Sequence, residues 1–222
     1  QVTVTTLGVS GASVFVGNNG PYQQMDGMLN PNAAGFSLAG VNFVVVRMTE
    51  VVEFGTPRKW DAIYAEAGSA QLVGIDGFTL GADEIIVQIN TAATDGSVVD
   101  FTQSDLDGNA DGKLTIDAGD EMLDIDFNSK LLQVQADVTL AIDQYVFVSG
   151  TVAFSKGTTA IATLSDGTDT QAATTKEVSV MTVAATDVDI FVGVNGPADA
   201  AGAMGLSIQN VDFGMALLKP TA

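Results

Sequence analysis

The sequence predicts an all-β protein with an elongated repeat architecture. Three observations carry this prediction: acidic residues that are mostly Asp, which favours turns over helices; 24 Gly; and apolar–polar alternation over most of the chain. We favour a β-solenoid, in which stacked units share one continuous core, because a single unit cannot bury its own apolar face. A β-sandwich with Greek-key connections is the alternative, because antiparallel hairpins show the same alternation.

The composition excludes several classes of function. The 222 residues carry 8 Lys+Arg against 27 Asp+Glu, a net charge of −19, with no Cys and no His. Such a chain repels nucleic acids and anionic membranes, so we expect no nucleic-acid partner. It also lacks thiolate and imidazole ligands, Ser-His-Asp triads and the usual general base. We therefore expect no enzyme.

The length of the apolar runs and the first residues of the chain indicate where the protein is located and whether it is processed. The longest apolar runs are far shorter than the ~20 residues of a membrane helix, so we expect no membrane insertion. The chain opens with Gln1 rather than Met and enters an alternating segment at once. We therefore expect it to be processed or to come from a longer protein.

Strands are predicted almost throughout. The clearest is 131–142, where every second residue is apolar. One stretch, 56–68, is ambiguous: Thr56, Pro57 and Gly68 suit the ends of a short helix, whereas Trp60 and Tyr64 also fit strand alternation. Turns are expected at Gly17–Pro21, Asp76-Gly77, Asp95-Gly96, Asp166-Gly167 and Gly193–Pro197. The remaining predicted strands are 12–17, 36–47, 70–75, 84–90, 122–127, 145–155, 159–164, 177–183, 188–194 and 206–218.

One long segment occurs twice. Residues 2–21 match 178–197 without a gap at an offset of 176, and the match resumes after a loop whose length differs between the copies. We divide the chain into 1–48, the C-terminal part of one repeat unit; 49–176, its middle; and 177–222, the start of the next copy. A shorter echo, AGSAQLVGIDGFTL, lies at 67–80. Neighbouring copies are therefore expected to stack end to end.

The middle of the repeat contains a calcium-type loop at 105–121. Asp107, Asn109 and Asp111 stand two residues apart and Gly112 follows, as in the first half of an EF-hand loop. Alternate side chains of a tight turn converge on one centre, and oxygen ligands without His or Cys favour Ca²⁺. A twelfth-position Glu is absent, since Ala118 stands there.

Further oxygen donors could complete this site. Lys113 would supply its backbone carbonyl, and Thr115 occupies the ninth position. Asp117, Asp120 or Glu121 could close it. The predicted ligand set is Asp105, Asp107, Asn109, Asp111, Lys113, Thr115, Asp117 and Asp120. The alternative is a solvated acidic turn without a bound metal.

Several blocks resemble the long repeats of giant bacterial surface and extracellular proteins. They are FVGVNGP at 191–197, GLSIQNVDFGMALLKP at 205–220, the block at 67–80 and QYVFVSGTVAFSKG at 144–157. The resemblance covers nearly the whole chain. It implies secretion, a cell-surface or matrix location, tandem arrays and calcium-dependent rigidity, with adhesion or scaffolding as the role.

The expected function is a non-catalytic extracellular structural or adhesive repeat module that builds a fibre, stalk or filament rigidified by Ca²⁺. Its expected partners are copies of itself or adjacent repeats, together with cell-surface or matrix components. The alternative is a carbohydrate- or ligand-binding β module. That alternative needs an exposed aromatic platform, to which only Trp60, Tyr64 and Tyr22 could contribute.

Overall fold

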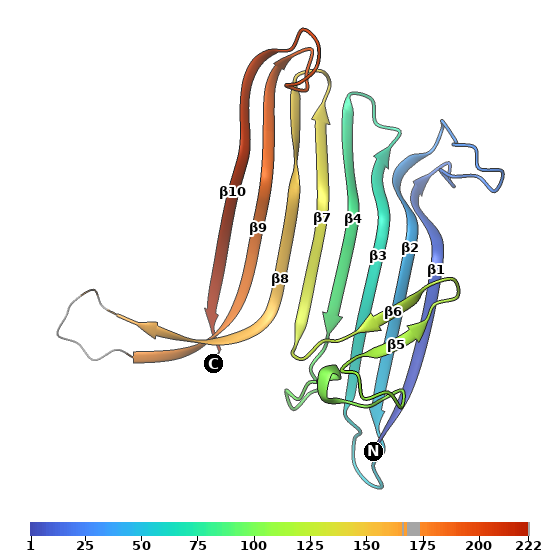
Figure 1. Ribbon diagram of the computed structural model, residues 1–222, viewed down its shortest axis with the longest axis vertical. Helices are drawn as coiled ribbons and strands as arrows, with labels where there is room; N and C mark the ends of the chain where they lie inside the picture. The colour runs from blue at the N-terminus through green and yellow to red at the C-terminus, as the bar shows by residue number, and fades with distance from the viewer. Residues whose placement is uncertain (166, 168–173, 222) are drawn as a thin grey trace.

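The computed structural model describes residues 1–165, 167 and 174–221, and these form an open all-β fold (Figure 1). Eight long strands make one antiparallel sheet, in which strand order follows the chain. They are β1 (Val2–Asn18), β2 (Ala34–Glu50), β3 (Lys59–Val73), β4 (Phe78–Asn90), β7 (Leu131–Ile142), β8 (Val146–Leu164), β9 (Thr174–Val194) and β10 (Met204–Pro220). β1 and β10 are the two edges. The all-β prediction is confirmed.

The strands are longer than the alternation suggested. The predicted strand at 131–142 matches β7 at both ends, but 145–155 and 159–164 belong to one strand, β8, and 177–183 and 188–194 to another, β9. The register between these two strands shifts at the interruptions. The breaks between the predicted strands therefore coincide with bulges, through which each strand continues.

The ambiguous stretch at 56–68 is a strand from Lys59 onwards, so the helical interpretation is wrong. Trp60 pairs with Met48, and Ala62 pairs with Val46, across β3 and β2. All four are buried. Pairing with two neighbouring strands outweighs the local helix signals, because tertiary packing routinely overrides propensity. Of the predicted turn at Asp166-Gly167, Asp166 lies outside the described residues.

The repeated segments fold into equivalent hairpins. In β1–β2, Phe15 lies opposite Ser37, and in β9–β10, Phe191 lies opposite Ser207. Both hairpins interrupt their register at the same two places. The backbone N–H of Gly11 donates to the side chain of Asn42 at 2.8 Å, and the equivalent bond joins Asp187 to Asp212 at 3.0 Å. The repetition in sequence is therefore a repetition of structure.

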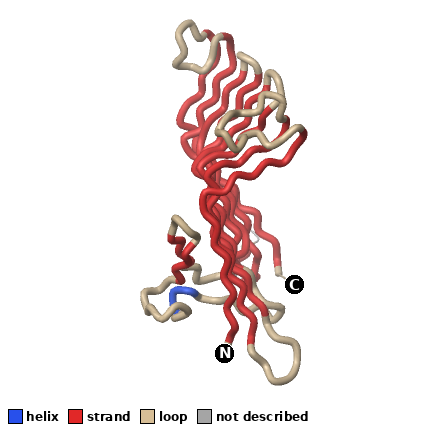
Figure 2. The backbone as a smooth tube through the Cα atoms, turned by 90° about the vertical axis from the view of Figure 1, so that its right-hand side faces the viewer, coloured by secondary structure: helices blue, strands red, loops and turns tan. Residues whose placement is uncertain are grey.

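A line of irregular backbone crosses the sheet at mid-height. Positive φ angles between 51° and 63° occur at Gly11, Gly40, Glu84, Asp187 and Asn210. Bulges raise the local twist of a strand. Figure 2 shows the result: the lower half of the sheet is seen nearly edge-on, and the upper half spreads out above it.

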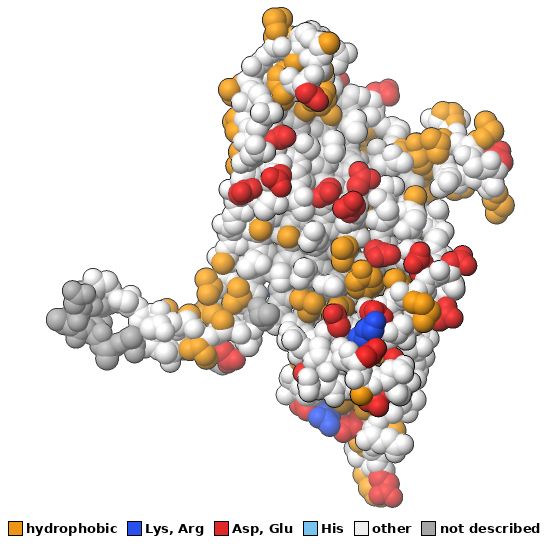
Figure 3. Space-filling model, in the orientation of Figure 1, with side chains coloured by type: hydrophobic (Ala, Val, Ile, Leu, Met, Phe, Trp, Pro, Cys, Tyr) orange, Lys and Arg blue, Asp and Glu red, His pale blue; other side chains and the backbone are white. Residues whose placement is uncertain are grey.

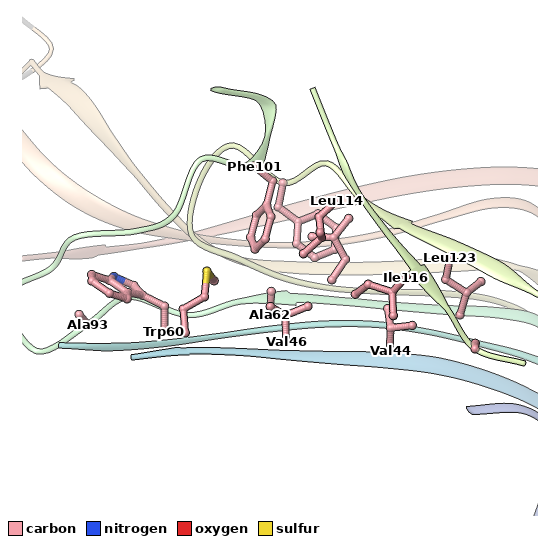
Figure 4. Packing of buried hydrophobic residues seen from close by; sticks show 13 residues of the cluster. Val44, Val46, Trp60, Ala62, Ala93, Phe101, Leu114, Ile116 and Leu123 are labelled. Carbon is pink, nitrogen blue, oxygen red and sulfur yellow. The ribbon is translucent and has the colours of Figure 1, made fainter. Parts of the chain in front are cut away.

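The segment between β4 and β7 covers the lower part of the sheet. It contains a short 3₁₀ helix, η1 (Phe101–Gln103), and a hairpin of β5 (Leu114–Asp117) and β6 (Met122–Ile125). Apolar side chains of this segment face those of β2 and β3 in the main buried core (Figure 4). The core consists of Val44, Val46, Met48, Trp60, Ala62, Ala93, Phe101, Leu114, Ile116, Ala118, Leu123, Ile125 and Phe127.

A glycine lets the β5–β6 turn approach β1. A Cβ atom at Gly8 would lie 2.5 Å from the backbone oxygen of Asp117 and 2.7 Å from the Cα of Ala118. The equivalent position in β9 is Ala184, and no hairpin formed by the described residues lies over it. The two copies thus differ in sequence at the position where the β5–β6 hairpin covers only the first copy. Among the described residues, no helix is long and apolar enough to cross a membrane.

Candidate calcium loop

The predicted calcium loop lies in the covering segment, between η1 and β5 (Figure 1). The strand that leaves the loop is anchored from below, because Leu114 and Ile116 point into the core and are 5% and 6% exposed. Leu106 packs against the same core on the other side of the loop. The loop is therefore tethered at both ends by apolar contacts, while its polar residues face outwards.

Asp107 organises the backbone of the loop. One carboxylate oxygen accepts the N–H of Asn109 at 2.9 Å, and the other accepts the N–H of Thr115 at 3.3 Å. The N–H of Asp111 donates to the carbonyl of Asn109 at 2.8 Å. Gly112 has a φ of +79°, which a glycine adopts readily. The loop thus folds back on the first residue of the motif.

Asp105 stabilises the entry to the loop. Its carboxylate accepts the N–H of Gly108 at 2.8 Å, which closes a tight turn at the start of the motif. Asp111 follows in the same loop and is exposed. Carboxylate and amide side chains from Asp105 to Asp111 therefore share one compact loop, which could present oxygen ligands to a cation.

Two predicted ligands face a residue that sequence reasoning missed. Lys113 Nζ lies 2.6 Å from Asp124 Oδ2, and the Thr115 hydroxyl donates to Asp124 Oδ1 at 2.6 Å. Thr115 and Asp124 are direct partners in the β5–β6 register. The signal for Asp124 was its outward position in a predicted strand, but the hairpin that brings it beside the loop was not predicted.

Asp117 and Asp120 lie apart from the rest. β5 separates them from Asp107, and four strand residues span roughly 13 Å. Asp117 accepts the N–H of Gly119 at 2.8 Å, and the N–H of Asp120 donates to Ser10 on β1 at 3.2 Å. The structure therefore places Asp117 at the end of β5 and Asp120 in the β5–β6 turn, away from the motif.

The electrostatics of the loop follow its hydrogen bonds. Backbone N–H groups of Asn109 and Thr115 lower the pKa of Asp107, because they stabilise its charged form. The ammonium of Lys113 and the hydroxyl of Thr115 lower the pKa of Asp124, and Asp124 raises that of Lys113. In the part of the chain that the structure describes, no three His, Cys, Asp or Glu side chains converge closely enough to hold a metal by themselves. A bound cation would also need amide and backbone oxygens.

The Asp124 contacts predict an acid-sensitive hairpin. A carboxyl whose pKa is lowered by folding stabilises the fold above its unfolded pKa, here 3.8, and loses that contribution as the pH falls further. Asp124→Asn should therefore flatten the fall of melting temperature with acid below about pH 4. The effect should be small, because the Lys113 and Asp124 side chains are 39% and 43% exposed. The measurement is a series of melts from pH 2 to 6, with Glu53→Gln in another exposed loop as control. An unchanged acid slope would contradict the expectation.

The aromatic residues expected to form a ligand-binding platform are largely buried or hydrogen-bonded. Trp60 is only 6% exposed, and its indole N–H donates to the Ser97 carbonyl at 3.0 Å, so it is a core residue. Tyr64 is half-buried, and its hydroxyl donates to Glu66 at 3.1 Å. Trp60 and Tyr64 therefore do not form the exposed platform on which the ligand-binding alternative depends.

A cavity of about 390 Å³ lies over β7–β10, beneath the β9–β10 loop. Phe147 and Phe191 line it together with Asp189 and Asp199. Asp189 already accepts the N–H of Asn210 at 3.0 Å, and Asp199 is exposed.

Comparison with known proteins finds no matching family model, no matching curated protein and no matching solved structure.

Proposed function

We propose that this chain is a non-catalytic extracellular structural or adhesive repeat module, secreted to the cell surface or matrix, that builds a fibre, stalk or filament rigidified by Ca²⁺. The observation that carries the proposal is the equivalence of the β1–β2 and β9–β10 hairpins at the two edges of one sheet. A sheet that begins and ends with the same hairpin is a periodic unit, and such units are suited to arrays.

The acidic loop supports a structural role for calcium. Asp105, Asp107, Asn109 and Asp111 occupy one turn, and the chain that leaves it enters the core at Leu114. A cation bound there would neutralise neighbouring carboxylates and hold the covering segment on the sheet. We propose these four residues as ligands, with the backbone carbonyl of Lys113. Thr115, Asp117 and Asp120 are less suited, because their side chains are bonded or placed elsewhere.

The finer architecture depends on what covers the bare faces of the sheet. In a β-solenoid successive units stack on one another, whereas in a β-sandwich a second sheet packs about 10 Å away. We propose the elongated repeat form, which is supported by a strand order that follows the chain and by the matching end hairpins. Small-angle scattering distinguishes the two, and compact globular monomers would contradict the elongated form.

A thermal melt in excess calcium, in chelator and in magnesium tests the calcium proposal. Calcium at about 100 times its Kd stabilises the folded state by about 2.7 kcal/mol. For a chain of this size, that corresponds to a rise in melting temperature of about 5–10 °C. Magnesium should give a much smaller rise, because it demands stricter octahedral geometry.

Matched variants make this test specific. Asp111→Ala removes a proposed oxygen ligand at an exposed position, so it should abolish the calcium shift and leave the melt in chelator nearly unchanged. Asp26→Asn, in the β1–β2 loop, should keep the full shift. Equal shifts in calcium and magnesium, or none in either, would mean that the loop is a solvated acidic turn.

A further inference from the structure

The edges of the sheet are long and poorly protected. β1 and β10 each have 17 residues and only one neighbouring strand in the described structure. β1 carries no charged side chain, and β10 carries only Asp212 and Lys219. Natural sheets usually guard such edges with charges, proline or a covering segment, because exposed backbone groups recruit other strands.

The repeat indicates what each edge accepts. β10 is the structural equivalent of β2, and the far side of β2 is paired along its length with β3, the first strand of the next hairpin. β1 is the equivalent of β9, and the far side of β9 is paired with β8, the second strand of the preceding hairpin. Each free edge therefore has an occupied counterpart within the same molecule.

The two edges also fit one another in direction. The eight strands alternate, so β1 and β10 run in opposite directions. Placed side by side, β10 of one copy and β1 of a second copy would pair antiparallel, as every neighbouring pair in the sheet does. β1 is the first strand of a hairpin, as is β3, which pairs with β2. β10 is the second strand of a hairpin, as is β8, which pairs with β9.

A row of apolar residues restricts the register in which β10 and β1 of two copies could pair. On one face of the upper half, one apolar residue from each strand lies directly opposite the next, from edge to edge. Opposing apolar side chains stabilise neighbouring strands. The row is Val16, Phe36, Leu72, Leu80, Leu140, Val148, Ile190 and Ile208.

Both ends of the row are exposed at the edges: Val16 is 68% exposed and Ile208 is 44% exposed. Pairing Val16 of a second copy with Ile208 or Leu206 keeps the row on one face. A slip by one residue would move it to the other face, so the row selects between registers.

The exposure of β10 also indicates that this edge of the sheet lacks a neighbour. Every residue of β10 except Val211 is exposed, whereas the equivalent strand β2 has buried Ser37, Val44, Val46 and Met48. β2 differs in having a strand on each side and the covering segment above. Figure 3 shows apolar side chains along the outer strand of the β10 side.

We propose that β10 of one copy pairs with β1 of a second copy, so that the sheet continues from molecule to molecule. The joint is head-to-tail: each copy keeps a free edge of each kind, and the assembly is open-ended. This inference deepens the proposed array and rests on it, because it identifies the surface through which copies of the chain join.

Lysine at an edge tests the joint. Thr6 and Ala216 are exposed and occupy equivalent levels, opposite Val46 and Thr182 of their hairpins. Thr6→Lys should block the β1 edge and Ala216→Lys the β10 edge. Sedimentation velocity of the full chain is measured at about 0.15 M salt, which screens the net charge beyond ~8 Å.

The expected pattern is specific to head-to-tail pairing. The unaltered chain should grow in size with concentration, and each lysine variant alone should stay monomeric. A mixture of the two should form dimers and nothing larger, since only one compatible pair of edges is left. Thr139→Lys, exposed on the interior strand β7, should behave as the unaltered chain.

Other outcomes overturn the proposal. Dimers of either lysine variant alone would mean like-with-like pairing, and a monomeric unaltered chain at all concentrations would mean that no such joint forms. If a lysine variant fails to fold, single cysteines at the same positions replace it, because the chain has no Cys of its own. A short bismaleimide should then join Thr6→Cys to Ala216→Cys above the share expected for random pairing. Failure here would leave the calcium shift and the proposed function standing, whereas loss of the calcium shift would leave the joint standing.

Discussion

Phe101→Ala is expected to lower the free energy of unfolding by about 3–5 kcal/mol. The Phe101 side chain is fully buried, and its ring meets that of Phe127 edge-on at a centroid distance of 6.3 Å. Its N–H also donates to the Phe127 carbonyl at 2.8 Å, so the residue joins the two ends of the covering segment. Removing the ring leaves a cavity between this segment and the sheet, which the surrounding strands cannot collapse to fill.

The matched control is Phe54→Ala. Phe54 is 90% exposed in the β2–β3 loop, so the same chemical change there should alter stability by less than about 0.5 kcal/mol. Urea unfolding followed by tryptophan fluorescence measures both, because Trp60 belongs to the same core. Similar losses in the two variants would mean that the covering segment does not contribute to the cooperative fold.

Asn90→Leu is expected to destabilise the protein by about 1–2 kcal/mol, although the two side chains are similar in size. Asn90 is 1% exposed, and its amide donates to the Val99 carbonyl at 2.9 Å and the Ser129 carbonyl at 3.0 Å. These carbonyls belong to the outgoing and returning ends of the covering segment. Leucine would remove both hydrogen bonds, and such a bond contributes about 0.5–1.5 kcal/mol to stability.

One feature of Asn90 works against this loss. Its Oδ1 atom is buried and has no hydrogen-bond partner among the described residues, so leucine also removes one unsatisfied acceptor. The expected value therefore lies below the sum of two full penalties. Asn128→Leu, at an exposed position near Ser129, is the control and should be nearly neutral. A stabilising Asn90→Leu would mean that hydrophobic burial outweighs the two lost bonds.

The candidate loop was predictable only in its local part. The spacing of Asp107, Asn109 and Asp111 indicated a tight turn, and the structure has one, because hydrogen bonds over two to eight residues form within the segment itself. Asp124 was missed, and Asp117 was grouped with the motif. The pairing of β5 with β6 decides both positions, and residue spacing does not show which strands pair.

The sequence by itself determined the strand class, the position of most turns and the repetition of the end hairpins. These follow from alternation, from Gly, Asn and Asp at turns, and from matched segments, all of which are local properties. Only the tertiary structure decided that Trp60 lies in a strand rather than a helix, and that the predicted strands 177–183 and 188–194 are one strand with a bulge near Asp187. It also placed the covering segment on β2 and β3, beside Gly8 of β1. The physical reason is that hydrogen bonds between distant strands and burial against distant side chains outweigh the small conformational preferences of a few neighbouring residues.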